Sequence, residues 1–121
     1  MAKIERFEDV EAWQRARELV GLIYKLTKKT AFEKDWGLKD QIQRAAVSIM
    51  ANIAEGFERH SDKEFLQFLY NARGSAGEVR SLLYVAADLN YITDDEFRKA
   101  FGKAEETSKA IFGLIRYLNV A

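Results

Sequence analysis

The chain has 121 residues, of which 48% are hydrophobic and 31% are charged. This balance is typical of a globular protein, and the length favours one domain spanning residues 1–121. Equal numbers of basic and acidic side chains, 19 of each, give a net charge of zero, which argues against a strongly electrostatic partner unless bases gather locally.

The chain contains no cysteine and a single histidine. Thiolate nucleophiles and cysteine-ligated zinc are therefore excluded, and catalysis by a Ser-His-Asp triad is disfavoured. A di-iron bundle needs Glu-x-x-His pairs, but Phe57 stands three residues before His60. We expect no enzyme, no metal, no cofactor and no small-molecule substrate.

No segment predicts export or membrane insertion. Residues 1–6 lack the apolar stretch of a signal peptide, and nowhere do eighteen apolar residues run together. We therefore expect a cytoplasmic protein with no membrane contact. The sequence has no proline and no linker-like tract, so nothing in it marks a domain boundary.

Charged residues typical of helix ends, together with apolar periodicity, predict the first two helices. Acidic Glu8 and Asp9 favour a helix start, and Lys25, Lys28 and Lys29 favour its end, so a helix is predicted over residues 8–29. Residues 31–37 break the apolar periodicity. A second helix is predicted over residues 38–57, where apolar positions recur with helical spacing.

Two capping boxes predict the starts of the remaining helices. Ser61 with Glu64 opens a helix that runs to about residue 89, and Thr93 with Glu96 opens the last one. Short connections make neighbouring helices antiparallel. The predicted fold is all-α, an up-down-up-down antiparallel four-helix bundle.

The second and third predicted helices carry more apolar surface than one bundle core can use. A helix that is apolar all round is buried all round, so we expect a second interface in a homo-oligomer. The alternative is that alanines are good helix formers and are tolerated outside, but the aromatic residues disfavour it. The surplus comprises residues 45–54, residues 82–87, Phe65, Phe68 and Tyr70.

Gly74 and Gly77 lie inside the third predicted helix. Each lowers the stability of the helix by about 1 kcal/mol relative to alanine, so we expect a stabilising contact nearby that offsets this loss. A G-x-x-G element also occurs in the RNA-binding KH fold, but that fold contains a sheet and no strand is predicted here. We therefore expect close helix packing at Gly74, with a kink as the lesser alternative.

Six charged pairs place an acid four residues ahead of a base along a helix, as in Glu11 and Arg15. Such pairs are typical of solvated helix faces. Some bases lack this acidic partner and are the candidates for nucleic-acid binding, with a solvated face as the alternative. These candidates are Arg17, Lys25, Lys28, Lys29, Arg73 and Arg80.

Several polar residues interrupt the apolar stretches. Glu55 and Glu78 suggest paired catalytic carboxylates, but buried polar groups are more often satisfied by neighbouring polar groups. We therefore interpret them as a structural polar cluster, which comprises Asn52, Glu55, Arg73 and Glu78.

Three segments carry a family resemblance: residues 10–16 (VEAWQRA), residues 44–56 (RAAVSIMANIAEG), and Glu64-Phe65 with Phe68-Leu69 ahead of residues 72–75 (ARGS). Together they resemble the bacterial four-helix-bundle family of 23S ribosomal RNA intervening-sequence proteins. That family is related to the accessory variability proteins of diversity-generating retroelements. The likeness covers nearly the whole chain, and the helical motif over residues 44–56 is its most specific part.

The resemblance implies a pentameric ring, no catalytic residues, and a partner that is RNA or a nucleic-acid-processing protein. Two features depart from it. The family usually has proline where this chain has Met50, and the retroelement relatives are basic whereas this chain is neutral. The leading hypothesis is a non-enzymatic homo-oligomer that binds structured RNA or a ribonucleoprotein. The alternative is a purely structural or protein-binding assembly module.

Overall fold

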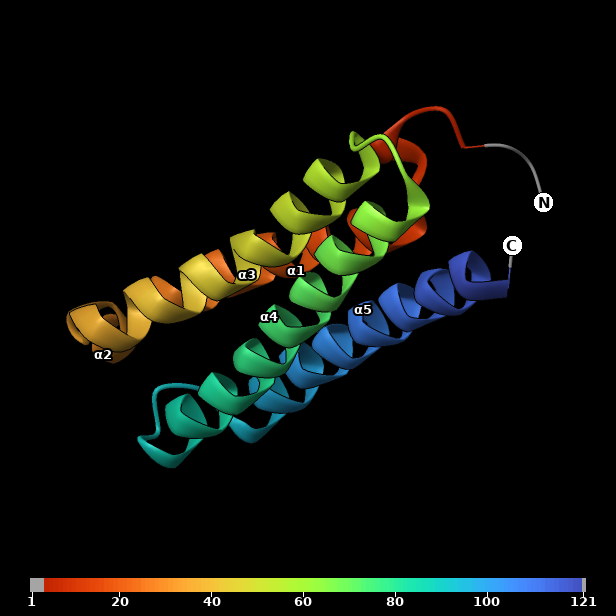
Figure 1. Ribbon diagram of the computed structural model, residues 1–121. Coiled ribbons are helices and arrows are strands. Elements are labelled where there is room, and N and C mark those ends of the chain that lie inside the picture. The colour runs from red at the N-terminus through yellow and green to blue at the C-terminus, as the bar shows by residue number, and fades with distance from the viewer. Residues whose placement is uncertain (1–3, 121) are drawn as a thin grey trace.

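The computed structural model describes residues 4–120, and side chains as far as Asn119. Within this part of the chain every regular element is a helix, which confirms the predicted all-α class. The described residues form four long helices and one short α-helix, and Figure 1 shows the long helices lying side by side with the short one at one end. The elements are η1 (Phe7–Asp9), α1 (Glu11–Thr27), α2 (Thr30–Lys34), α3 (Trp36–Phe57), α4 (Asp62–Asp88) and α5 (Asp94–Val120).

The predicted first helix was too long at both ends. Glu8 and Asp9 belong to the single turn η1, and α1 ends at Thr27. The segment predicted to be irregular contains α2, because Phe32 at its centre is fully buried, with its ring 5.4 Å from that of Tyr91. This anchor makes a helical turn favourable where the periodic pattern is interrupted.

Side-chain caps set the starts of the last three helices. The Glu64 amide donates to Ser61 Oγ at 3.2 Å, and the Glu96 amide donates to Thr93 Oγ1 at 3.1 Å. In the second box Glu96 also accepts from the Thr93 amide, so both orphan donors are satisfied. Asp35 caps α3 by accepting from the Leu38 amide at 3.1 Å, a start that the sequence patterns had not indicated.

Each long helix has two long neighbours. α1 packs against α3 and α5, and α4 packs against the same two helices, so α1 and α4 lie diagonally across the bundle. The α1–α5 pair is antiparallel, since Arg15 meets Glu106 while Glu18 meets Lys103. The diagonal placement separates side chains on α1 from those on α4.

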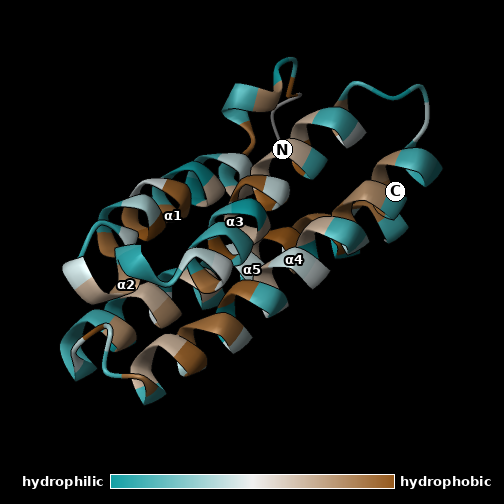
Figure 2. Ribbon diagram, turned by 90° about the vertical axis from the view of Figure 1, so that its left-hand side faces the viewer, coloured by the Kyte–Doolittle hydropathy of each residue, from teal (hydrophilic) through white to brown (hydrophobic). Residues whose placement is uncertain are grey.

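The core is made of aliphatic and alanine side chains from all four long helices. Leu19, Ile49, Leu83 and Ile111 have no exposed surface. Figure 2 shows hydrophobic residues, in brown, recurring along each long helix between hydrophilic ones. The buried Thr107 hydroxyl donates to the Lys103 carbonyl at 2.8 Å, so this polar group is satisfied inside the core.

Close helix packing occurs at Gly56 and not at Gly74, which corrects the expectation from the sequence. A Cβ at Gly56 would lie 2.6 Å from Phe68 Cβ and 3.0 Å from Phe65 Cδ1, so only glycine lets α3 approach α4 here. A Cβ at Gly74 would meet no atom within 4 Å among the described residues. The subunit alone therefore does not explain the glycine at position 74.

Lys29 and Glu96 join the C-terminal side of α1 to the start of α5. The hydrogen bond from Lys29, together with that from the Thr93 amide, lowers the pKa of the Glu96 carboxyl below its usual value. A lowered pKa in the folded state stabilises the fold above the unfolded pKa, and this stability is lost as pH falls through the folded value.

Glu96→Gln keeps an oxygen for the Thr93 amide but removes the charge. We expect it to lower the free energy of unfolding by less than about 1 kcal/mol at pH 7, because the pair is partly exposed. Urea unfolding of parent and variant at pH 7 and pH 3 checks this, and the difference should be smaller at pH 3, below the unfolded pKa of the carboxyl. A difference of equal size at both pH values would show that the charge is not its cause.

Candidate nucleic-acid interface

The six candidate bases do not form one surface. Arg17, Lys25 and Lys28 lie on or directly after α1, followed by Lys29, whereas Arg73 and Arg80 lie on α4. Since α1 and α4 are diagonal, the two groups are on different sides of the bundle. The structure therefore places the candidate bases in two separate groups.

Arg17, Lys25 and Lys28 form what we call the α1 basic row. All three are exposed, and they share the outward face of α1 over about 16 Å of helix axis. None of them has a carboxylate oxygen within 4.0 Å among residues 4–119. Their charges are therefore available to a partner.

Lys29 does not belong to this row. Its ammonium group is paired with Glu96 on α5, and both side chains are only about one-third exposed, at 37% and 33%. The sequence analysis missed this acid because Glu96 is 67 residues away along the chain. Lys29 is therefore a structural cation that ties α1 to α5.

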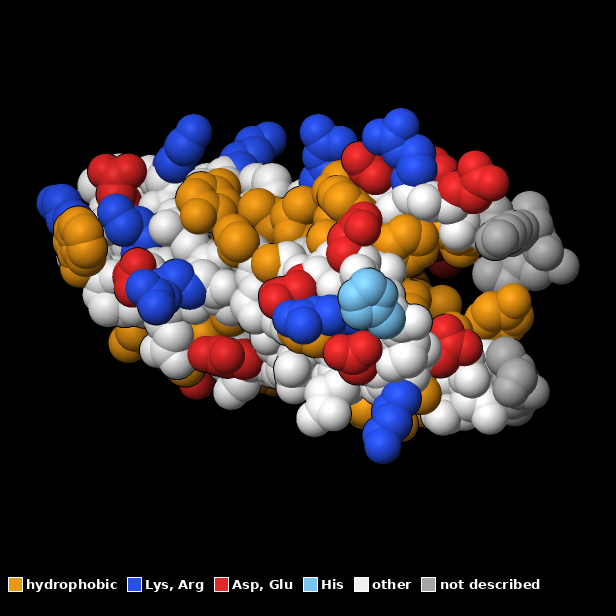
Figure 3. Space-filling model, turned by 45° about the horizontal axis from the view of Figure 1, so that its top comes forward, with side chains coloured by type: hydrophobic (Ala, Val, Ile, Leu, Met, Phe, Trp, Pro, Cys, Tyr) orange, Lys and Arg blue, Asp and Glu red, His pale blue; other side chains and the backbone are white. Residues whose placement is uncertain are grey.

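Apolar side chains lie beside the α1 basic row. Tyr24 of α1 is 40% exposed and Val47 of α3 is 39% exposed, with half-buried Val20 and Met50 between the two helices. Figure 3 shows a band of hydrophobic side chains on this side of the molecule, with Lys and Arg side chains along its upper edge. The surface combines positive charge with apolar contact area.

Three aromatic residues near the row were not singled out from the sequence. Trp13 and Tyr24 share the helix face of Arg17, whose guanidinium lies 5.7 Å from the Trp13 ring centre. Trp36, at the start of α3, is 73% exposed, with the Lys39 ammonium 5.2 Å from its ring centre. In the sequence, positions 13, 17, 24 and 28 are separated by four, seven and four residues. This helical spacing alone would have placed these aromatic and basic side chains on one face of α1.

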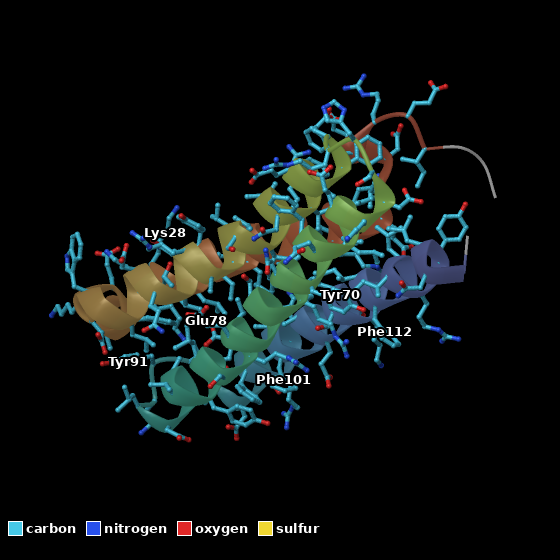
Figure 4. All side chains as sticks on the ribbon, viewed as in Figure 1. Lys28, Tyr70, Glu78, Tyr91, Phe101 and Phe112 are labelled. Carbon is cyan, nitrogen blue, oxygen red and sulfur yellow. The ribbon has the colours of Figure 1, made fainter. Side chains whose placement is uncertain are left out.

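A second basic region lies between α4 and α5. The Arg73 guanidinium stands 4.6 Å from the Phe112 ring centre. Figure 4 shows Tyr70 and Phe112 together over α4 and α5, well away from Lys28. A hollow of about 230 Å³, which we call the α4–α5 hollow, is lined by Arg73, Arg80, Glu105, Ser108, Lys109 and Phe112.

The predicted polar cluster is not formed. Glu55 pairs with Arg59 at 2.8 Å, and Glu78 accepts from Gln41 at 3.2 Å. Because residues 41 and 55 are separated by about 20 Å along α3, the two glutamates lie far apart. Arg73 faces Phe112 on the other side of α4.

A different polar group joins α3 to α4 near the middle of both helices. The Asn52 amide donates to the Ser48 carbonyl and to Ser48 Oγ, and Ser48 Oγ lies 3.0 Å from Ser75 Oγ. These short side chains satisfy one another within the helix interface. The sequence analysis named Asn52 but not its serine partners.

In the part of the chain with described placement, no group of three or more His, Asp or Glu side chains is arranged to hold a metal ion. Likewise, no helix over the described residues combines the length and apolar character needed to cross a membrane.

The fold is that of a small all-helical protein. Two groups of basic side chains and several apolar side chains lie on its surface. Its sequence matches the family described as "23S rRNA-intervening sequence protein" over residues 8–113, and the chain belongs to that family. A search of curated proteins found no match.

The fold is similar to the crystal structure of a protein of unknown function from the S23 ribosomal protein family of Bacteroides thetaiotaomicron VPI-5482. The TM-score is 0.81 at 26% sequence identity, covering 86% of this chain and 97% of that one.

Proposed function

We propose that the protein is a non-enzymatic, homo-oligomeric interaction module that binds structured RNA, alone or within a ribonucleoprotein. Its subunit is an up-down-up-down antiparallel four-helix bundle. The observation that carries RNA binding is the α1 basic row, in which Arg17, Lys25 and Lys28 are exposed without an acidic partner among the described side chains.

Phosphate contacts explain how a neutral chain binds RNA. Each base that meets a phosphate releases condensed counterions, so a local row of three cations contributes although the net charge is zero. Repetition of the row around an oligomer multiplies the effective affinity without new contacts. Tyr24, on the same face of α1, adds exposed aromatic surface beside the row.

Assembly is supported by exposed apolar side chains on two different helices. Tyr70, Tyr84 and Val85 on α4 are 52%, 54% and 40% exposed, and Val47 on α3 is 39% exposed. Contacts between two different surfaces of identical subunits are heterologous, and they close into rings when the rotation permits. A ring of five is the number that the family resemblance implies.

RNA binding is tested by titrating fluorescently labelled duplex RNA with the parent protein between 50 and 200 mM salt. We expect affinity to fall steeply with salt and to depend little on sequence, because phosphate contacts dominate. No detectable binding at 50 mM salt would contradict RNA binding. It would leave a structural or protein-binding assembly as the function.

Assembly is tested by light scattering at micromolar concentration, where we expect a mass larger than that of a dimer. Tyr70→Glu should lower this mass while preserving helical circular dichroism, since Tyr70 is exposed in the subunit. Phe68 is less suitable, because it packs against Gly56 and Arg59. Tyr117→Glu, on α5, is the matched control for an exposed tyrosine.

A parent mass equal to that of one chain would contradict assembly. A mass that falls equally in the Tyr70 and Tyr117 variants would show that α4 is not the specific contact.

A further inference from the structure

We propose that the α4–α5 hollow binds a phosphate monoester, such as the terminal phosphate of an RNA strand or a free phosphate. Three bases, Arg73, Arg80 and Lys109, line the hollow against one acid, Glu105. The site lies on the face of α4 that also carries Tyr70 and Tyr84, beside the proposed subunit contact, and its binding of phosphate does not depend on the α1 basic row.

The positive charge in the hollow is not compensated within the subunit. No carboxylate oxygen lies within 4.0 Å of Arg73, Arg80 or Lys109 among residues 4–119, so Glu105 does not pair with Lys109. Arg80 is half-buried, and its covered Nε has no hydrogen-bond partner among the described atoms. A partly desolvated guanidinium without a counter-charge favours an anion from outside.

The position of the Arg80 guanidinium follows from the sequence of α4. Arg80 Nη2 would lie 3.6 Å from a Cβ placed at Gly77, so the side chain folds back along the helix toward Arg73. With glycine at position 77, the helix surface beside the guanidinium stays bare.

Charge and shape favour a phosphate monoester over a carboxylate. The lining carries a net charge of about +2, which matches the charge of about −1.5 to −2 on a monoester at pH 7. The Ser108 hydroxyl supplies a neutral donor, and guanidinium groups suit the geometry of phosphate oxygens. Phe112 forms an apolar wall for the group that carries the phosphate.

The size of the hollow is sufficient for such a group. Its volume of about 230 Å³ is more than ten times the roughly 10–15 Å³ that one water molecule requires. The lining side chains come from α4 and α5, which pack directly against each other, so the packing of these two helices brings the bases to one hollow.

The experiment compares a short oligouridylate carrying a 5′-phosphate with the same strand ending in a 5′-hydroxyl, both labelled at the 3′ end. Fluorescence anisotropy should show about tenfold tighter binding of the phosphorylated strand, as expected for one additional charge-assisted contact. Inorganic phosphate is added as a competitor at constant ionic strength. If inorganic phosphate competes, the hollow binds phosphate from any source. If it does not compete, the hollow binds the phosphate at the end of an RNA strand.

Three variants locate the site. Arg80→Gln and Lys109→Gln should each abolish most of the preference for the 5′-phosphate, while Lys99→Gln removes one exposed charge from α5 away from the hollow and should preserve it. Because Lys109 is exposed, its variant stays informative even if Arg80→Gln alters folding. Replacing Arg17, Lys25 and Lys28 by glutamine should instead weaken binding of both strands and leave the preference for the 5′-phosphate unchanged, because the α1 basic row is a separate group of bases.

Equal affinity for the two strands, together with no competition by inorganic phosphate, would overturn the proposal. A preference that survives in both hollow variants would overturn it as well, because the phosphate would then bind elsewhere. If Arg80→Gln instead lowers the oligomer mass and no phosphate preference exists, the proposal is wrong and the anion is a carboxylate of a second copy.

Discussion

Gly56→Ala is expected to destabilise the protein by about 1–3 kcal/mol, although alanine is the better helix former. The added methyl group would lie 2.6 Å from Phe68 Cβ and 3.0 Å from the Phe65 ring. Phe68 Cβ is fixed to the α4 backbone, so relief requires α3 and α4 to separate. Urea unfolding followed by circular dichroism measures the change.

The matched control is Gly21→Ala in the middle of α1. A Cβ at Gly21 meets nothing within 4 Å among the described residues, so only helix propensity changes. This variant should gain up to about 1 kcal/mol of stability. If Gly56→Ala unfolds at the same urea concentration as the parent or higher, close packing does not constrain that position.

The second large effect is expected from neutralising the α1 basic row. Replacing Arg17, Lys25 and Lys28 together by glutamine should weaken duplex RNA binding and lower the salt slope by about 2 to 3, because each phosphate contact contributes about 0.9 to that slope. Folding and assembly should persist, since the three side chains are exposed. Lys29 is left unchanged because it pairs with Glu96.

A second triple variant distinguishes the effect of losing the α1 basic row from the effect of lowering the net charge of the protein. Replacing Lys63, Arg98 and Lys99 by glutamine removes the same charge from exposed positions on α4 and α5. RNA binding should change much less in this variant. Equal losses in the two triple variants would mean that RNA responds to overall charge, and an unchanged salt slope in the α1 variant would remove the row from the interface.

The helix starts of the last two elements follow from local chemistry. Ser61 and Thr93 accept from amides three residues ahead, and such contacts depend only on neighbouring residues. The same locality explains why α2 was missed. Its helical turn depends on Phe32 packing against Tyr91, a contact between distant segments.

The site was only partly predictable. The absence of an acid four residues earlier identified Arg17, Lys25 and Lys28, which the structure shows exposed and without an acidic partner among the described residues. The same rule also selected Lys29, whose acid comes from another helix. A rule that looks along one helix does not detect ion pairs between helices.

The sequence alone determined the all-α class, the caps of α4 and α5, and the exposed bases of α1. These depend on apolar periodicity and on groups within one turn of each other. The tertiary structure decided that α1 and α4 are diagonal, that close helix packing constrains Gly56 and not Gly74, and that Arg80 and Lys109 line the same hollow. Such features depend on which helices become neighbours and on their axial register, and helical periodicity specifies neither of these.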